Sequence, residues 1–169
     1  RPSRSRLVLA VLLAVTALLC AGCAGSRSDA VSYAAADLRS GEQVSIDSLR
    51  GRPALLVSWA TWCRECDEEL TGLQAFAESD EAVGIEIVAV NLDAADVDDD
   101  IDAKVEANGL DVTLWRDRRN DFKRSFGALG VPTTVVIDAD GRVAGTFPGG
   151  VDFEDEEMRT TLDAVRTGT

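Results

Sequence analysis

The chain has 169 residues, 46% of them hydrophobic, which suits a single domain with one ordinary core. It contains 30 acidic and 17 basic residues, so its formal net charge is −13. Such acidity opposes binding to nucleic acid or to anionic lipid, and we expect no nucleic-acid partner. Histidine is absent, so a structural zinc site with four Cys or His ligands would need all four cysteines.

The first 22 residues have the pattern of a secretory signal peptide. Three arginines precede an uncharged apolar run, Leu7 to Leu19, which is shorter than the roughly 20 residues that span a bilayer. The run ends in Leu-Cys-Ala-Gly-Cys, which resembles a bacterial lipobox with Cys23 as the lipidated residue. The resemblance implies an exported protein anchored to the cell membrane through Cys23. The alternative is an ordinary signal peptide that is simply cleaved.

Residues 23–36 are predicted to be a flexible membrane tether, because they begin with small and polar residues such as Gly25, Ser26 and Ser28. Without residues 1–22 the chain loses three basic residues and no acidic one, so its net charge becomes −16. A domain this acidic is not attracted to anionic lipid. We therefore expect its contact with the membrane to come from the lipid on Cys23.

Signals for regular structure begin after the tether. Alternating Val44 and Ile46, flanked by turn signals, predict a short hairpin within Asp37–Pro53. The apolar run Pro53–Ser58 predicts a buried strand, and the segment from Cys63 to about Glu78 has the composition of a helix.

The rest of the chain alternates strands and helices. Val97, Ile101 and Val105 recur at helical spacing and predict a helix that stops at Asn108-Gly109. The other predicted elements are strands over residues 85–92, 112–115, 133–138 and 142–147, a short helix over 120–126 and a closing helix through 158–165. This order of elements fits a mixed sheet between helices.

Two cysteines lie at the predicted junction between a strand and a helix, in Trp59-Ala60-Thr61-Trp62-Cys63-Arg64-Glu65-Cys66. The first turn of a helix has unpaired N–H groups and a positive dipole end, which can lower a cysteine pKa from about 8.5 to roughly 3.5–7.5. Cys63 is nearer the helix start, so we expect it to be the nucleophile and the more exposed sulfur, with Cys66 as the resolving cysteine.

Neither alternative use of this cysteine pair fits the sequence well. A structural disulfide gains little from closing a two-residue loop, because its effect grows with loop length. A zinc site would need Cys20 and Cys23, which lie in the targeting segment. Reversible dithiol–disulfide exchange is therefore the favoured interpretation of Cys63 and Cys66.

The motif from Trp59 to Cys66, followed far downstream by Gly130-Val131-Pro132-Thr133-Thr134, resembles the thioredoxin superfamily, specifically its TlpA/ResA-like extracytoplasmic branch. The resemblance runs from about Asp37 to Val165. It implies an α/β fold over residues 37–169, a three-layer sandwich with a central mixed sheet and helices on both faces. The N-terminal β-hairpin and an inserted central helix would be additions of this branch. It also implies a monomer with no cofactor beyond the redox-active disulfide Cys63–Cys66.

The same resemblance implies a substrate groove beside the cysteines. Pro132 resembles the cis-proline that faces the cysteines in this superfamily, and the backbone of Val131 would pair with an extended substrate segment. Trp62 would border this groove, whereas Trp59 is expected to pack in the core.

Glu69 lies three residues after Cys66, within one helical turn of it. In ResA-like proteins a glutamate at this position helps proton transfer and tunes the thiols, so the resemblance makes Glu69 a catalytic candidate. The alternative is a solvated helix face, since Asp67 and Glu68 are acidic too. Val57 stands where cytoplasmic thioredoxins have a buried aspartate. That proton acceptor is absent here, which strengthens the case for Glu69 as the catalytic carboxylate.

An acidic run extends from Asp93 to Asp102. A calcium-binding loop of the EF-hand type would need glycine in place of Ile101 and glutamate in place of Ala107, so that pattern fails and no metal is expected. The run is instead predicted to be a solvated loop followed by the first turn of a helix.

The leading functional hypothesis is a membrane-anchored extracytoplasmic thiol–disulfide oxidoreductase that reduces cysteines of exported proteins. By resemblance, apocytochrome c is a typical client and a membrane thiol carrier supplies the electrons. One alternative is a thiol peroxidase, although its motif would require proline at Leu56 and threonine at Ala60. The other is a lipoprotein that binds partners through the groove at Val131 and Pro132 without electron transfer.

Overall fold

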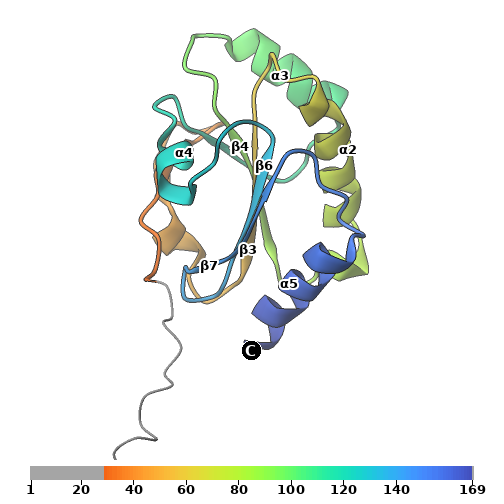
Figure 1. Cartoon of the computed structure of the whole chain (residues 1–169). Helices are drawn as coiled ribbons and strands as arrows, with labels where there is room; N and C mark the ends of the chain where they lie inside the picture. The colour runs from red at the N-terminus through yellow and green to blue at the C-terminus, as the bar shows by residue number, and fades with distance from the viewer. Residues whose placement is uncertain (1–28, 169) are drawn as a thin grey trace, which may run out of the picture.

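A computed structural model describes residues 29–168 of the chain. The predicted signal peptide of residues 1–22 and the lipidation candidate Cys23 lie outside the described residues. Figure 1 shows a central sheet with helices on both of its sides. None of the helices within residues 29–168 combines the length and the apolar composition of a membrane-spanning segment.

The sheet has seven strands among the described residues, in the order β2-β1-β5-β4-β3-β6-β7. Their bounds are β1 Ala34–Asp37, β2 Gln43–Ser45, β3 Ala54–Trp59, β4 Glu86–Asn91, β5 Thr113–Arg116, β6 Thr133–Ile137 and β7 Val143–Pro148. Strands β3, β4 and β5 run parallel to one another, while β6, β7, β1 and β2 each pair antiparallel with their neighbours. The predicted mixed sheet is confirmed.

The helices are α2 Glu65–Ala77, α3 Asp98–Ala107, α4 Asp121–Phe126 and α5 Glu156–Thr167, with short 3₁₀ helices η1 Ile46–Leu49 and η2 Asp80–Ala82. In Figure 1, α2, α3 and α5 lie on one side of the sheet and α4 on the other. Helix α3 is the predicted inserted helix, and it ends one residue before Asn108, close to the predicted stop. The three-layer α/β sandwich is confirmed.

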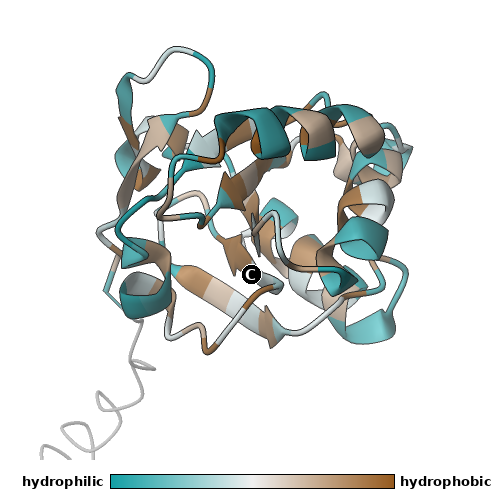
Figure 2. Cartoon of the chain, turned by 90° about the horizontal axis from the view of Figure 1, so that it is seen from above, coloured by the Kyte–Doolittle hydropathy of each residue, from teal (hydrophilic) through white to brown (hydrophobic). Residues whose placement is uncertain are grey.

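Alternation along the strands divides the buried side chains between two cores. In β3, Leu55, Val57 and Trp59 face the core under α2 and α5, whereas Ala54 and Leu56 face the core under α4. Successive side chains of a strand point to opposite faces, and here both faces are covered, so the whole strand is apolar. Figure 2 shows brown, apolar residues recurring along the central strands and teal residues over the outer helices and loops.

The folded domain begins earlier than predicted. Strand β1 starts at Ala34 and pairs with both β2 and β5, so the N-terminal hairpin uses residues that had been assigned to the tether of residues 23–36. Tyr33 is buried, and its ring contacts Trp115, Phe122 and Phe126. The prediction missed this strand because its alanines carry none of the β-branched or aromatic residues that mark a strand.

Candidate active site

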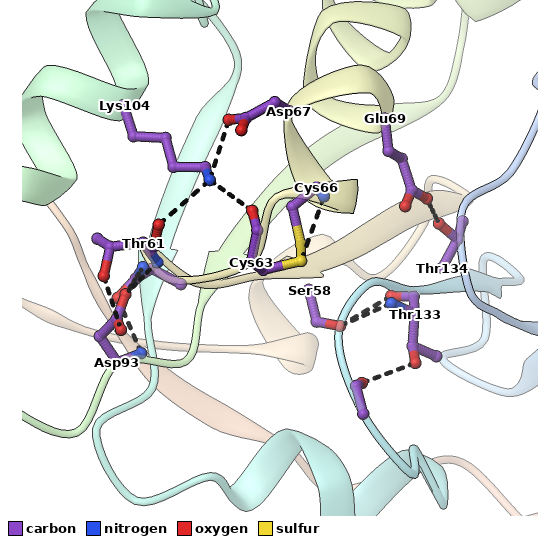
Figure 3. Close-up of a disulfide and its surroundings, with 12 residues drawn as sticks. Ser58, Thr61, Cys63, Cys66, Asp67, Glu69, Asp93, Lys104, Thr133 and Thr134 are labelled. Atoms are coloured by element: carbon purple, nitrogen blue, oxygen red, sulfur yellow. Dashed lines mark hydrogen bonds and ion pairs between the residues drawn. A yellow bond between two sulfur atoms is a disulfide. The ribbon is translucent and has the colours of Figure 1, made fainter.

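A disulfide joins Cys63 and Cys66 in the turn between β3 and α2. Helix α2 begins at Glu65, so Cys63 lies just ahead of the helix and Cys66 in its first turn. The backbone N–H of Cys66 donates to the Sγ atom of Cys63 at 3.2 Å, which is the contact of a helix N-terminus with a sulfur atom. Figure 3 shows the disulfide at the start of this helix. The sequence-based placement of the pair at a strand-to-helix junction is correct.

Both cysteines are nearly covered in this oxidised form. Cys63 is 3% exposed and Cys66 is fully buried, so Cys63 is the more accessible of the two by only a small margin. The neighbouring Trp62, by contrast, is 69% exposed. A large exposed indole therefore stands next to Cys63 in the chain, while the sulfur of Cys63 itself is nearly covered.

The loop before β6 contains a cis peptide bond between Val131 and Pro132, as the resemblance implied. This loop is fixed to β3, because the Ser58 hydroxyl donates to the backbone C=O of Thr133 at 3.1 Å and accepts from its N–H at 3.0 Å. Figure 3 shows Ser58 and Thr133 on the opposite side of the disulfide from Lys104. Among the described residues the backbone groups of Val131 make no backbone hydrogen bond.

Glu69 is buried, so a solvated helix face is the wrong description of this residue. Its Oε1 atom accepts a hydrogen bond of 2.5 Å from the Thr134 hydroxyl, and its Oε2 atom is buried with no partner among residues 29–168. Burial raises the pKa of Glu69 from 4.5 to about 7, and the Thr134 hydrogen bond only partly offsets that rise. Near neutral pH this carboxyl can therefore both hold and release a proton.

Asp93 was predicted to lie in a solvated acidic run, and that prediction is wrong for this residue. It is only 5% exposed, and its carboxylate accepts hydrogen bonds from the Thr61 N–H at 2.8 Å, the Thr61 hydroxyl at 3.1 Å and the Asn91 side chain at 2.8 Å. Asp93 follows β4, whose C-terminal end lies beside that of β3 in the parallel pair. It therefore supports the turn that carries the cysteines, a role the sequence analysis missed.

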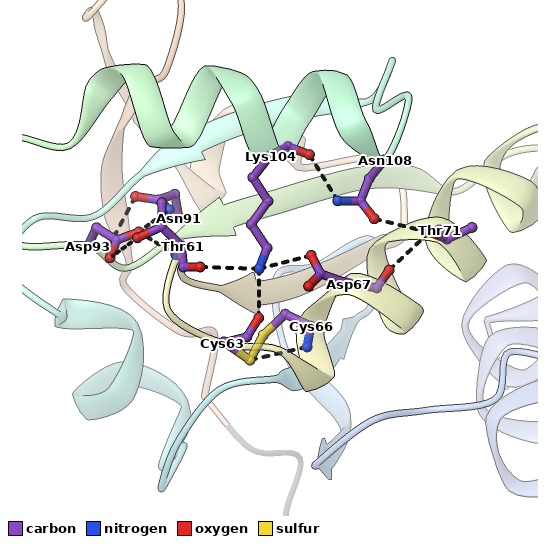
Figure 4. A network of polar contacts seen from close by, with 9 residues as sticks. All are labelled: Thr61, Cys63, Cys66, Asp67, Thr71, Asn91, Asp93, Lys104 and Asn108. Atoms are coloured by element: carbon purple, nitrogen blue, oxygen red, sulfur yellow. Dashed lines mark hydrogen bonds and ion pairs between the residues drawn. A yellow bond between two sulfur atoms is a disulfide. The ribbon is translucent and has the colours of Figure 1, made fainter.

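Lys104 is a second residue of the site that the sequence analysis missed. Its Nζ atom lies 2.6 Å from the backbone oxygen of Cys63, 3.4 Å from that of Thr61 and 2.9 Å from Oδ1 of Asp67. Figure 4 shows these contacts reaching from α3 to the turn before α2. The only sequence signal was that Lys104 is the one basic residue in the acidic segment Asp98–Ala107.

Two other residues named in the sequence analysis, Trp59 and Val57, are buried. Trp59 is fully buried in the core, and Val57 is buried and apolar, so it supplies no proton acceptor beneath the disulfide. Residues 29–168 contain no group of three or more His, Cys, Asp or Glu side chains arranged to hold a metal ion. The chemistry that these side chains can carry out is dithiol–disulfide exchange, with Glu69 as the nearby group that titrates close to neutral pH.

Comparison with known proteins gives consistent matches over this domain. The AhpC/TSA family matches residues 27–146, well over half of the chain. The thiol-disulfide oxidoreductase ResA of Geobacillus thermodenitrificans is 28% identical over 139 residues, which cover 82% of this chain and 77% of that protein. ResA of Bacillus thuringiensis subsp. konkukian is 26% identical over 121 residues, covering 72% and 68%.

A solved structure supports the fold. The crystal structure of a putative thiol:disulfide interchange protein DsbE from Chlorobium tepidum has a TM-score of 0.70 to this chain at 24% identity, and the match covers 83% of this chain and 97% of that one. The resemblance to the thioredoxin superfamily and its ResA-like branch, drawn from two short motifs, is thus confirmed over most of the chain.

Proposed function

The chain belongs to the AhpC/TSA family and is a thiol–disulfide oxidoreductase, and from this premise we propose that it works outside the cytoplasm, anchored to the cell membrane by lipidated Cys23. Its task there is to reduce cysteines of exported proteins, of which apocytochrome c is one candidate. The apolar run of residues 7–19 and the lipobox-like residues that follow support the anchoring. The reducing direction is what the resemblance to the TlpA/ResA-like branch implies, and the ResA relatives are named thiol-disulfide oxidoreductases.

The observation that carries the chemistry is the disulfide at the start of α2, with the helix N–H of Cys66 directed at the sulfur of Cys63. In the reduced protein the Cys63 thiolate attacks a client disulfide, and one client sulfur leaves as a thiolate. The Cys66 thiolate then attacks the Cys63 sulfur, which releases the second client sulfur and forms the Cys63–Cys66 disulfide. Two electrons pass to the client, and a membrane thiol carrier restores the dithiol.

Glu69 is the proposed proton acceptor for the Cys66 thiol. A resolving cysteine must lose its proton before it can attack, and burial raises the pKa of a thiol in apolar surroundings. The pKa of Glu69, raised to about 7, suits a group that takes this proton near neutral pH and later releases it. Its position on the sheet side of α2, one helical turn from Cys66, supports this role.

The client is proposed to enter as an extended segment. Cys63 is only 3% exposed in the disulfide-bonded form, which favours a client that presents its disulfide on an accessible segment. Two observations support this mode of entry: the backbone groups of Val131 make no backbone hydrogen bond among the described residues, and the indole of Trp62, next to Cys63 in the chain, is exposed. Newly exported, unfolded chains fit these requirements.

Reduction of insulin by the protein tests the exchange chemistry. We expect activity in the wild type and none in Cys63→Ser, because that variant lacks the attacking sulfur. Cys66→Ser keeps the nucleophile Cys63 but lacks the thiol that releases the client from the mixed disulfide. In native membranes it should therefore accumulate mixed disulfides that identify the client. An active Cys63→Ser protein would contradict the assignment, as would peroxide turnover faster than disulfide exchange.

Anchoring has its own test. Cys23→Ser should release the protein from the membrane fraction while leaving insulin reduction by the domain unchanged, because Cys23 lies well before β1 in the chain. Retention of the Cys23→Ser protein in the membrane fraction would rule out the lipid anchor.

A further inference from the structure

Helix α3 brings a covered ammonium group to the turn that carries the reactive cysteine. The Lys104 side chain is only 10% exposed, and its Nζ atom contacts the backbone oxygens of Thr61 and Cys63 and the carboxylate of Asp67. A covered charge is costly unless it is paired and hydrogen-bonded, so these contacts account for its position. All three partners belong to the active-site turn or to the first turns of α2.

The two members of the Lys104–Asp67 pair are not screened equally. The Asp67 side chain is 53% exposed, whereas that of Lys104 is 10% exposed. Solvent and salt weaken the field of the exposed carboxylate more than that of the covered ammonium. Of the two charges in this pair, the positive one is therefore the less screened, and it lies 2.6 Å from the backbone oxygen of Cys63.

We propose that Lys104 is a positioning residue of the exchange reaction, which holds the Cys63 turn by its backbone oxygens and supplies a fixed positive charge that favours the reduced, thiolate form of Cys63. The role rests on the exchange chemistry of Cys63 and Cys66, but it adds a residue from outside the cysteine motif. A charge that stabilises the thiolate stabilises the dithiol form relative to the disulfide, so Lys104 makes the protein a better oxidant.

Other charged groups lie in the turn or near it. They are Arg64 and Glu65 at the start of α2, Glu69 one turn further along α2, and Asp93 in the loop after β4. Arg64 and Glu65 are exposed and of opposite sign, so their effects on Cys63 partly cancel. Asp93 is buried against Thr61, and its charge opposes that of Lys104. Single substitutions are needed to isolate the contribution of each group.

The test is the pKa of Cys63 in the reduced full-length protein, measured from the pH dependence of its alkylation by iodoacetamide. Lys104→Met removes the charge and the hydrogen bonds, whereas Lys104→Gln removes the charge but keeps an N–H donor. We expect both variants to raise the pKa of Cys63 by about one unit. At pH 8 the equilibrium with glutathione should move about tenfold toward the disulfide, which corresponds to about 30 mV.

Two further variants separate charge from packing. Asp67→Asn removes the partner carboxylate and should lower the pKa of Cys63, opposite in sign to the Lys104 variants. Thr71→Val removes an uncharged tie between α2 and α3, the 3.0 Å hydrogen bond from the Thr71 hydroxyl to Asn108, and should leave the pKa unchanged (Figure 4). A packing role for Lys104 would instead make Thr71→Val resemble Lys104→Met.

The proposal is overturned if both Lys104 variants keep the wild-type pKa of Cys63 to within about 0.2 units, or if Thr71→Val shifts it as much as they do. Using two Lys104 variants keeps the test decisive if the apolar methionine prevents folding. Insulin reduction by the wild type shows whether a negative result rejects the exchange function or only the role of Lys104. An inactive wild type would reject the exchange function itself, whereas an active wild type with unchanged variant pKa values would reject only the role of Lys104.

Discussion

The buried carboxyl of Glu69 should make the stability of this protein fall as the pH rises through the neutral range. Burial raises its pKa from 4.5 to about 7 in the folded state, while the unfolded chain keeps the ordinary value. Between these two values the folded state holds a proton that the unfolded state has lost. The associated stability is therefore fully present below about pH 4.5 and is lost as the pH rises through 7. A shift of this size corresponds to about 3 kcal/mol.

Glu69→Gln tests this reasoning, because the amide is neutral at every pH and can still accept the hydrogen bond from Thr134. We expect the variant and the wild type to have similar free energies of unfolding near pH 4. Near pH 8 the variant should be the more stable by about 3 kcal/mol, since it carries no buried charge. Urea unfolding of the oxidised proteins, followed by far-UV circular dichroism at several pH values, measures the difference.

Glu68→Gln is the matched control, since Glu68 is the preceding residue of α2 and is exposed. Its stability relative to the wild type should not change with pH by more than about 0.5 kcal/mol. The reasoning about Glu69 is refuted if the difference between Glu69→Gln and the wild type is the same at pH 4 and pH 8. It is refuted equally if the sign is reversed, so that the wild type gains stability relative to the variant at high pH.

The described contacts lead to four other predictions. Trp62→Ala should lower kcat/KM for insulin reduction by roughly tenfold, equivalent to about 1.4 kcal/mol, yet barely change the unfolding midpoint in urea, because the indole is 69% exposed. Asp93→Ala should lower the free energy of unfolding by about 2–3 kcal/mol, since it leaves buried donors unpaired, whereas Asp99→Ala, at an exposed position, should have little effect in the same assay. Gly72→Ala should raise the thermal midpoint, because its new methyl group would lie 3.6 Å from the nearest ring atoms in a helix interior and the gain is about 0.5–1 kcal/mol. Gly145→Ala should lower that midpoint, because its methyl group would lie 2.8 Å from a ring carbon.

Sequence alone predicted most of the sheet, because its central strands are covered on both faces. Strands β3, β4 and β6 appear in the sequence as nearly continuous apolar runs, and their observed bounds lie within one residue of the predicted ends. The cysteine motif was equally readable, since a thiol pair with this spacing at a strand-to-helix junction has few other uses. Strand β1 could not be predicted from the sequence, because its pairing with β5 is set by backbone hydrogen bonds and by the burial of Tyr33.

The burial of Glu69 could have been predicted more firmly than it was. Cys66, Leu70 and Leu73 define the apolar face of α2, and Glu69 lies three residues from Cys66 and four from Leu73. This spacing places Glu69 on the same face. The neighbouring acidic residues at positions 67 and 68 suggested a solvated surface only because the composition was considered without the rotation of each residue around the helix axis.

The contacts of Asp93 and Lys104 could not be predicted from side-chain patterns, because both residues bind backbone atoms of the turn at Thr61 and Cys63. Every residue has such backbone groups, so no motif records them as partners. Lys104 reaches the turn because of the way α3 packs. Ile101 is buried in the core with α2, and Lys104, three residues later, lies on the same face of the helix. Helix α3, which is far from the cysteines in the sequence, thus contacts their turn through Lys104, and the burial of Ile101 fixes its position. Substitutions that alter how Ile101 packs should consequently change the pKa of Cys63, because they would move Lys104.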